Sequence, residues 1–186
     1  TLEETARMAV DLANGDPIKD NYCDPIDYEV SRPLAADKTV KGLYSGGSLA
    51  AEAGMLIAEA LNLGGLIKEE GYILKTGGYE VVDLGDDVYT QGKPHPMIDP
   101  EVRIKKILEC AKDPQTGVIL LDCMLGYGCH PDMAGALAPA IREAQEIAKA
   151  DGRELYFVAS VCGTRQDPQD YDRAVAELKE CGVLVE

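Results

Sequence analysis

The sequence predicts an α/β domain built on a doubly wound parallel sheet, and three observations support this prediction. Apolar runs typical of strands alternate with helix-like segments through residues 39–186. The run at residues 117–122, GVILLD, is almost continuously apolar, as in strands buried on both faces of a parallel sheet. Glycine-rich or Asp-Pro segments stand where strands give way to helices. Regular alternation of this kind places helices on both faces of one sheet.

The elements of the domain are expected in a simple order. Apolar residues at helical spacing mark the first helix, at residues 49–63. Two Asp-Pro pairs mark later helix starts, because Asp accepts from free N–H groups and Pro fits the first turn. We expect strands at residues 40–44, 80–84, 117–122, 154–160 and 183–185, separated by helices at residues 49–63, 99–112, 133–150 and 167–181.

Five strands in about 150 residues fit the strand order 2-1-3-4-5 of a flavodoxin-like fold. Residues 64–79 are glycine-rich and are expected to hold a small excursion before the second strand. Ligands of such folds bind outside the carboxyl ends of the strands, near the point where the strand order reverses. The loops that leave those ends are therefore the expected site: residues 45–48, 85–100, 123–132 and 161–167.

The first 38 residues differ from the rest of the chain. Residues 2–14 have helical apolar spacing, whereas residues 16–38 contain three prolines and five aspartates without a sustained period. We therefore expect an N-terminal helix and irregular arm at residues 1–38 and the flavodoxin-like domain at residues 39–186. Because the chain begins with Thr1, we expect it to be a piece of a longer protein.

Composition limits the partners of the protein. The net charge of −15 and the sequence pI of about 4.5 disfavour nucleic acid and anionic membrane surfaces. No apolar run approaches the roughly 20 residues of a membrane span, and no signal segment precedes the domain. The six cysteines form no CxxC pair and are typical of reduced thiols, so we expect a cytoplasmic protein. With two histidines and no paired ligand spacing, no metal site is expected.

The turn Ser45-Gly46-Gly47-Ser48 is the first candidate binding element. It follows a strand and opens a helix, so its backbone N–H groups and the helix dipole suit a phosphate or a carboxylate. It matches neither the Walker P-loop nor the GxGxxG fingerprint. The alternative is a turn that only packs the helix on the sheet.

Two histidines are candidate catalytic residues. His95 lies between two prolines, which stiffen its backbone, and His130 lies in the reactive loop 126–132. In that loop Gly126 and Gly128 are candidate anion-binding residues, and Cys129 is a candidate low-pKa thiol at a helix start.

The loop after the fourth strand offers the backbone of Gly163, the Thr164 hydroxyl and Arg165 to an anion. Asp99 and Asp167 are expected to cap helices, and Lys93 is expected to be solvated. Asp86 and Asp87 could instead hold a metal or orient a histidine.

Four motifs together resemble the FdrA family, over about residues 40–186. They are GLYSGGSLAAEA at 42–53, VDLGDDVYTQGKPHPMIDPEVR at 82–103, LLDCMLGYGCHPDMAGALAPAI at 120–141 and VASVCGTRQDPQ at 158–169. FdrA proteins resemble succinyl-CoA synthetases, and this region is similar to their C-terminal, flavodoxin-like ligase-CoA domain.

The resemblance implies chemistry on an acyl or carbamoyl phosphate or on a CoA thioester, in an acyl-CoA synthetase-like ligase or a carbamoyltransferase. It implies CoA or phosphate as a substrate and no tightly bound cofactor. It also implies a CoA-binding-like domain on the N-terminal side, assembly into homo- or hetero-oligomers, and a link to purine (allantoin and oxamate) catabolism. In the related ligase α subunit a GHAGA-type motif carries a phosphorylated histidine, whereas this chain has Cys162-Gly163-Thr164 at that place.

Three functions therefore stay open at this point. The domain is part of an enzyme acting on an activated acyl group, or it is a non-catalytic assembly domain that completes the site of a partner subunit. A thiol-redox role for Cys129 or Cys162 is the third alternative, and the absence of a CxxC motif argues against it.

Overall fold

The computed structural model describes residues 2–22 and 35–185, in two units divided between residues 33 and 34. In the first unit, the helix α1 (Leu2–Asn14) is amphipathic and has no buried residue, which confirms the helix expected there. The assignment of residues 1–38 and 39–186 to an arm and a domain stays a prediction, and Cys23 lies outside the described residues. Within the described ranges, no helix has the length and apolarity that crossing a membrane requires.

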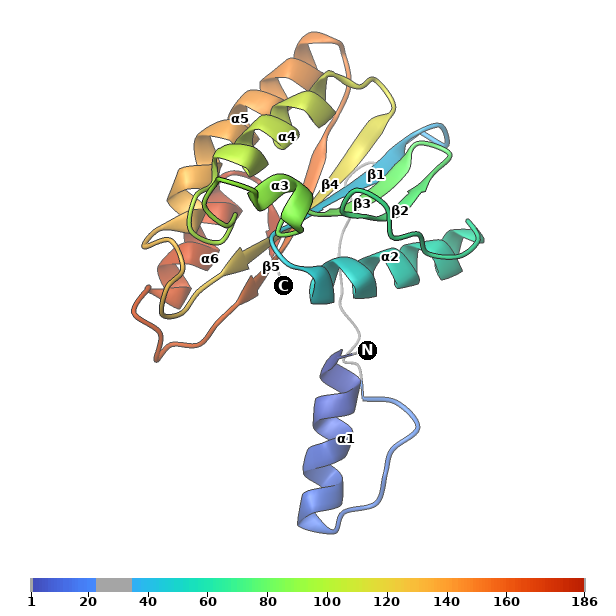
Figure 1. Ribbon diagram of the computed structural model, residues 1–186, viewed down its shortest axis with the longest axis vertical. Coiled ribbons are helices and arrows are strands. Elements are labelled where there is room, and N and C mark those ends of the chain that lie inside the picture. Colours follow the sequence, from blue (N-terminus) through green and yellow to red (C-terminus); the bar gives the residue numbers. More distant parts are fainter. Residues whose placement is uncertain (1, 23–34, 186) are drawn as a thin grey trace. The chain divides into compact units, whose positions relative to one another are not determined.

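The second unit contains one six-stranded sheet with the order β2-β3-β1-β4-β5-β6 (Figure 1). All neighbouring strands are parallel except β2 and β3. The α/β class and the largely parallel sheet are thus confirmed. The strands are β1 (Thr39–Tyr44), β2 (Tyr72–Thr76), β3 (Tyr79–Asp83), β4 (Thr116–Met124), β5 (Tyr156–Cys162) and β6 (Leu184–Val185).

The prediction of five strands in the order 2-1-3-4-5 was wrong, because an edge strand was missed. Residues 72–76, placed in the glycine-rich excursion, form β2 and pair antiparallel with β3. Gly77 and Gly78 join the two strands with φ values of 56° and 87°, as a tight hairpin turn requires. The five parallel strands follow in the order β3-β1-β4-β5-β6, so the order reverses beside β1.

The helices of this unit are α2 (Gly47–Leu61), α3 (Asp87–Thr90), α4 (Glu101–Lys112), α5 (Met133–Ala150) and α6 (Tyr171–Glu180). The start of α6 corrects one expectation. Asp170, not Asp167, caps this helix and accepts a hydrogen bond from the Arg173 N–H at 2.9 Å. Asp167 instead accepts from the N–H and the hydroxyl of Thr164 and closes the preceding turn.

Two apolar clusters lie on opposite faces of the sheet. Leu43 and Val82 belong to the larger cluster, with residues of α4, α5 and α6. Their neighbours Tyr44 and Val81 belong to a smaller cluster with residues of α2. Because successive strand residues point to opposite faces, α2 covers one face and α4 and α5 the other (Figure 1). Because β1, β3, β4 and β5 run parallel, the loops that follow them lie at the same end of the sheet, beside the carboxyl ends of the strands.

Candidate functional site

A buried ion pair fixes the first residue of the β1–α2 turn. Asp122 at the end of β4 is 1% exposed, and Arg103 of α4 is fully buried. Arg103 Nη2 lies 2.9 Å from Asp122 Oδ1 and also donates to the Asp122 carbonyl. The Ser45 N–H donates to the same carboxylate at 2.9 Å and the Ser45 hydroxyl at 2.6 Å. Ser45, a predicted anion-binding residue, is thus buried and already paired with a carboxylate.

The next residues of this turn open the helix without a side-chain cap. Gly46 is the N-cap of α2, its backbone is extended, and it has no side chain to accept from the first-turn N–H groups. By contrast Asp86, Asp132 and Asp170 accept from N–H groups at the starts of α3, α5 and α6. An anion at Gly47 and Ser48 would take the role that these carboxylates have elsewhere.

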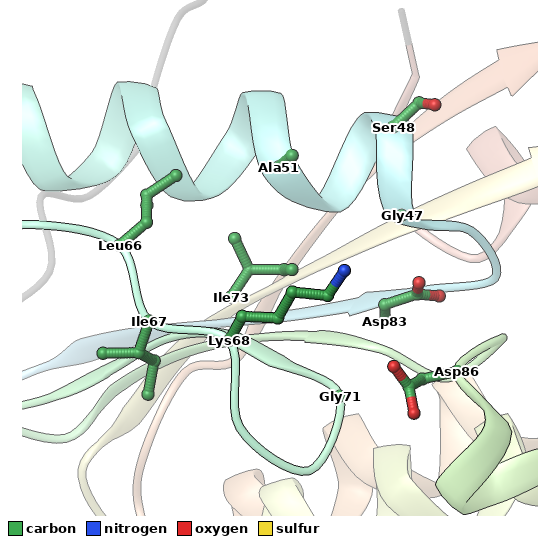
Figure 2. Close-up of a pocket in the computed structure, with 10 residues that line it drawn as sticks. All are labelled: Gly47, Ser48, Ala51, Leu66, Ile67, Lys68, Gly71, Ile73, Asp83 and Asp86. Atoms are coloured by element: carbon green, nitrogen blue, oxygen red, sulfur yellow. The ribbon is translucent and has the colours of Figure 1, made fainter.

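A cavity of about 700 Å³ lies beside the start of α2 (Figure 2). One end is polar. Lys68 and Asp83 lie near the first turn of the helix, and Asp86, which accepts from the Val88 N–H, lies on the side opposite α2 (Figure 2). The other end is apolar. The full lining is Gly47, Ser48, Ala51, Leu66, Ile67, Lys68, Gly71, Ile73, Asp83 and Asp86. Of these, only Gly47, Ser48 and Asp86 were singled out in the sequence.

Asp83 is a carboxylate close to the start of α2. Burial raises the pKa of its carboxyl, and the charges of Asp86 and Asp122 act in the same direction. A hydrogen bond from the Gly85 N–H at 2.8 Å and the nearby His95 lower the pKa in part. A Cβ on Gly47 would lie 2.9 Å from Asp83 Oδ2. Ionised Asp83 therefore opposes an anion at the start of α2, and protonated Asp83 would permit it.

We expect Asp83→Asn to strengthen anion binding and to stabilise the fold at neutral pH. A folded-state pKa above the unfolded value means that the contribution of Asp83 to stability is complete below the unfolded pKa of roughly 3.9. It is lost as the pH rises through the folded-state pKa, so the ionised carboxylate is unfavourable at pH 7. Sulfate affinity, measured by calorimetry from about pH 4 upward to pH 8, should fall as the pH rises through the raised pKa of Asp83 in the wild type and less in Asp83→Asn. Exposed Asp87→Asn is the charge-matched control, and equal pH dependence in all three proteins would contradict the expectation.

His95 lies against the same turn, between β3 and α4. The Met97 N–H donates to His95 Nδ1 at 3.2 Å, so a neutral ring carries its proton on Nε2. A Cβ on Gly85 would lie 2.6 Å from His95 Nε2 and 2.6 Å from the Ser45 carbonyl oxygen. The absence of a side chain at Gly85 thus lets the imidazole approach the β1–α2 turn.

His130 lies in the loop after β4, with different neighbours. The Asp132 N–H donates to His130 Nδ1 at 3.0 Å, and the His130 N–H donates to the Met97 carbonyl at 2.8 Å. This second bond ties the two histidine loops together.

Gln169, which sequence reasoning passed over, holds the loop after β4. Its Oε1 accepts from the Gly126 N–H at 2.9 Å, and its Nε2 donates to the carbonyls of Gly126 at 3.0 Å and His130 at 3.2 Å. The N–H of Gly126 is therefore already paired, while Gly128 lies exposed at the tip of the loop.

We expect Gln169→Leu to loosen the loop that carries His130. The substitution keeps the size of the side chain but leaves the Gly126 N–H and two carbonyls without their partner, which costs about 1–3 kcal/mol. Hydrogen–deuterium exchange at residues 126–130 should accelerate and the melting temperature should fall. Exposed Gln166→Leu is the control, since only its backbone N–H forms a described hydrogen bond. Unchanged exchange in Gln169→Leu would contradict this role.

The loop after β5, a predicted anion-binding element, has polar side chains that are paired with nearby carboxylates. Gly163 and Thr164 are exposed, and both Thr164 donors point to Asp167. Arg165 makes a two-point ion pair with Asp172 at 2.8 and 2.9 Å. Within the described residues, the Thr164 donors and the Arg165 guanidinium are thus paired with nearby carboxylates. Anion binding by Gly163, Thr164 and Arg165 stays a prediction.

The thiols among the described residues lack the lowered pKa of reactive cysteines. Burial and Asp167 raise the pKa of Cys129, and burial and Asp122 raise the pKa of Cys162. Burial also raises the pKa of Cys123 to about 11. The expectation of a low-pKa thiol at Cys129 was wrong, because burial and the charge of Asp167 both raise its pKa. No group of three metal-ligating side chains occurs in the described ranges.

Comparison with known proteins finds a matching family model and related curated proteins. The family model described as "CoA-ligase" matches residues 43–186. "Uncharacterized protein YahF" of Escherichia coli (strain K12) is 35% identical over 173 residues, which is 85% of this chain and 34% of that protein. The chain thus spans about a third of the length of this relative.

Proposed function

The chain belongs to the CoA-ligase family, and from this premise we propose that it forms the part of a CoA-ligase-type enzyme that binds an activated acyl or carbamoyl group. The group would be activated as a phosphate or as a CoA thioester. The observation that carries the proposal is the uncapped start of α2. This helix start and Lys68 line the same cavity, of about 700 Å³.

The first turn of α2 supports the binding of the phosphate. Backbone N–H groups at a helix start attract anions through hydrogen bonds and through the helix dipole, each favourable by about 0.3–1 kcal/mol at an exposed site. Lys68 adds a positive charge on the opposite wall (Figure 2). Asp83, with its raised pKa, would donate a hydrogen bond to the bound anion when it is protonated.

Of the two candidate histidines, His95 is the better placed for a role in transfer. Its Nε2 faces Gly85 and the Ser45 carbonyl, beside the turn that would bind the phosphate. An Nε2–H donor there would act as a general acid or stabilise charge that develops on a departing oxygen. His130 would support this loop through its hydrogen bond to the Met97 carbonyl.

The more specific family assignment rests on the four sequence motifs that resemble the FdrA family. We propose an FdrA-like relative of succinyl-CoA synthetase that acts in the cytoplasm in purine catabolism. We propose that it functions in an oligomer, together with a CoA-binding-like domain. Cys162-Gly163-Thr164 replaces the family's histidine motif, so the proposed reaction does not pass through a phosphohistidine at that position.

A second candidate function is an assembly domain that completes the site of another subunit. Burial alternates along β5: Phe157 and Val161 are buried, whereas Val158 and Cys162 on the other face are only half-buried. Helix α2 packs on β1, β2 and β3 of that face. A half-open apolar face on an interior strand suits contact with another domain or subunit.

The decisive experiment is a thermal-shift titration of the purified chain with inorganic phosphate, carbamoyl phosphate and CoA, against potassium chloride of equal ionic strength. A ligand at 100 times its Kd stabilises the folded state by about 2.7 kcal/mol. We expect phosphate and carbamoyl phosphate to raise the melting temperature of the wild type and much less that of Lys68→Gln. Lys179→Gln, an exposed cation in α6, is the matched control.

The outcomes separate the two candidates. A shift that is weakened in Lys68→Gln and kept in Lys179→Gln would support the enzyme. No shift with any ligand, combined with self-association in analytical ultracentrifugation, would favour the assembly domain. An equal shift in both lysine variants would place the anion elsewhere and refute this site.

A further inference from the structure

The cavity beside α2 has an apolar end that phosphate binding alone does not use. Ile73 of β2 and Leu66 extend toward α2, which contributes Ala51 (Figure 2), and Ile67 is the fourth apolar residue of the lining. Leu66 is 44% and Ile67 is 37% exposed. Large aliphatic side chains that line a cavity while exposed to water favour an apolar ligand, because its binding removes them from water.

This wall is held in place before any ligand binds. The Ile67 N–H donates to the Ile73 carbonyl at 2.8 Å, and Glu69 and Tyr72 exchange backbone hydrogen bonds at 2.9 and 3.3 Å. Segment 66–73 is thereby fixed to the edge of the sheet. A preformed wall binds without the entropic cost of ordering a loop.

Charge distinguishes the two ends of the cavity. Lys68 extends toward the end that holds Asp83 and the first turn of α2 (Figure 2). Within the described residues, the Lys68 ammonium makes no ion pair. Beyond this end, the wall of Ala51, Leu66 and Ile73 offers no charged partner, so a second carboxylate placed against it would lose part of its hydration and gain no ion pair.

We propose that this cavity selects a short, uncharged aliphatic acyl group, with the activated carboxyl end at Gly47 and Lys68 and the hydrocarbon chain against Leu66, Ile67 and Ile73. The inference rests on the proposed function and names the substrate class of that site. An aliphatic monocarboxylic acid would be accepted, and a dicarboxylic acid would be rejected.

The test compares inorganic phosphate with an alkyl phosphate ester and with a phosphonate whose tail ends in a carboxylate. Inorganic phosphate, n-butyl phosphate and 3-phosphonopropionate are titrated into the 186-residue chain by calorimetry. Each buried CH₂ contributes roughly a fourfold gain in affinity, and the cavity is open on one side. We therefore expect n-butyl phosphate to bind at least about tenfold more tightly than phosphate, and 3-phosphonopropionate no more tightly than phosphate.

Two variants of the wall, Leu66→Ser and Ile67→Ser, test its role. Both residues are exposed, so the fold should tolerate the changes, which circular dichroism checks. We expect each variant to reduce the preference for n-butyl phosphate about threefold or more while phosphate binding is unchanged. Met55→Ser, on an exposed position of α2 outside the cavity lining, is the matched control.

The possible failures are distinguishable. If phosphate binds and the butyl tail adds nothing, the acyl pocket is wrong and the proposed function stands. If the tail strengthens binding equally in the Leu66→Ser and Ile67→Ser variants and the wild type, the tail lies elsewhere and the inference is also wrong. If neither inorganic phosphate nor n-butyl phosphate binds, both the proposed function and this inference are wrong.

Discussion

Asp122→Ala should be among the most damaging single substitutions in this chain, with a loss of about 3–5 kcal/mol in the free energy of unfolding. Arg103 would remain fully buried without its carboxylate partner, and the N–H and hydroxyl of Ser45 would lose their acceptor. Denaturant unfolding followed by circular dichroism measures the loss. Because Ser45 begins the turn before α2, phosphate binding should weaken as well.

A double-mutant cycle isolates the ion pair. Arg103→Met alone leaves the Asp122 carboxylate buried without its partner, whereas the double variant Arg103→Met/Asp122→Ala removes both charges. The free energy of unfolding that the double variant loses should be smaller than the sum of the two single losses by at least about 1 kcal/mol. Two further nitrogens of Arg103, Nε and Nη1, are buried without a partner among the described residues, which adds to the cost of retaining this side chain. Exposed Asp172→Ala is the control and should leave the unfolding midpoint near that of the wild type. A loss below about 1 kcal/mol in Asp122→Ala would refute the account of a buried pair.

Gly85→Ala should damage both the fold and the position of His95. The new Cβ would lie 2.6 Å from the Ser45 carbonyl oxygen, which is backbone adjacent to the buried Asp122 network, so the strain cannot be relieved by a side-chain rotation alone. Overpacking of this kind costs about 1–3 kcal/mol. The same Cβ would lie 2.6 Å from His95 Nε2 and push the imidazole away from the turn.

Two measurements separate these effects. Thermal unfolding reports the strain, and the NMR chemical shifts of the His95 ring at one fixed pH report its displacement from the turn. Gly65→Ala is the matched control, because nothing lies within 4 Å of a Cβ at that position. A Gly85→Ala protein with the melting temperature and the His95 ring chemical shifts of the wild type would contradict the proposed contact between the loop and the turn.

Much of the fold follows from short-range patterns in the sequence. The apolar run of β4 and the helical spacing in α2 predicted those elements, because burial on both faces or on one stripe selects residue types directly. The edge strand β2 was missed, although the Gly77-Gly78 pair between Thr76 and Tyr79 is a hairpin signal. Short, partly exposed edge strands lack the continuous apolar run that marks an interior strand.

In the candidate site, too, the sequence predicted some elements and missed others. The sequence located the turn before α2 and the loops of His95 and His130, since parallel topology brings the carboxyl ends of strands to one edge. It did not identify Arg103, Asp122 or Lys68. An aspartate at the end of an apolar strand was the only local sign of the buried pair, and its partner lies 19 residues earlier in the chain.

The sequence by itself determined the alternation of elements, the acidic character and the loops in which chemistry is expected, because each depends on residues close together in the chain. Only the tertiary structure decided how these loops combine. It turned Ser45 inward onto Asp122 and brought Lys68 from the excursion to the start of α2. It also placed His95 against Gly85. Such contacts join residues distant in sequence, and their energies depend on burial and distance, which no local pattern encodes.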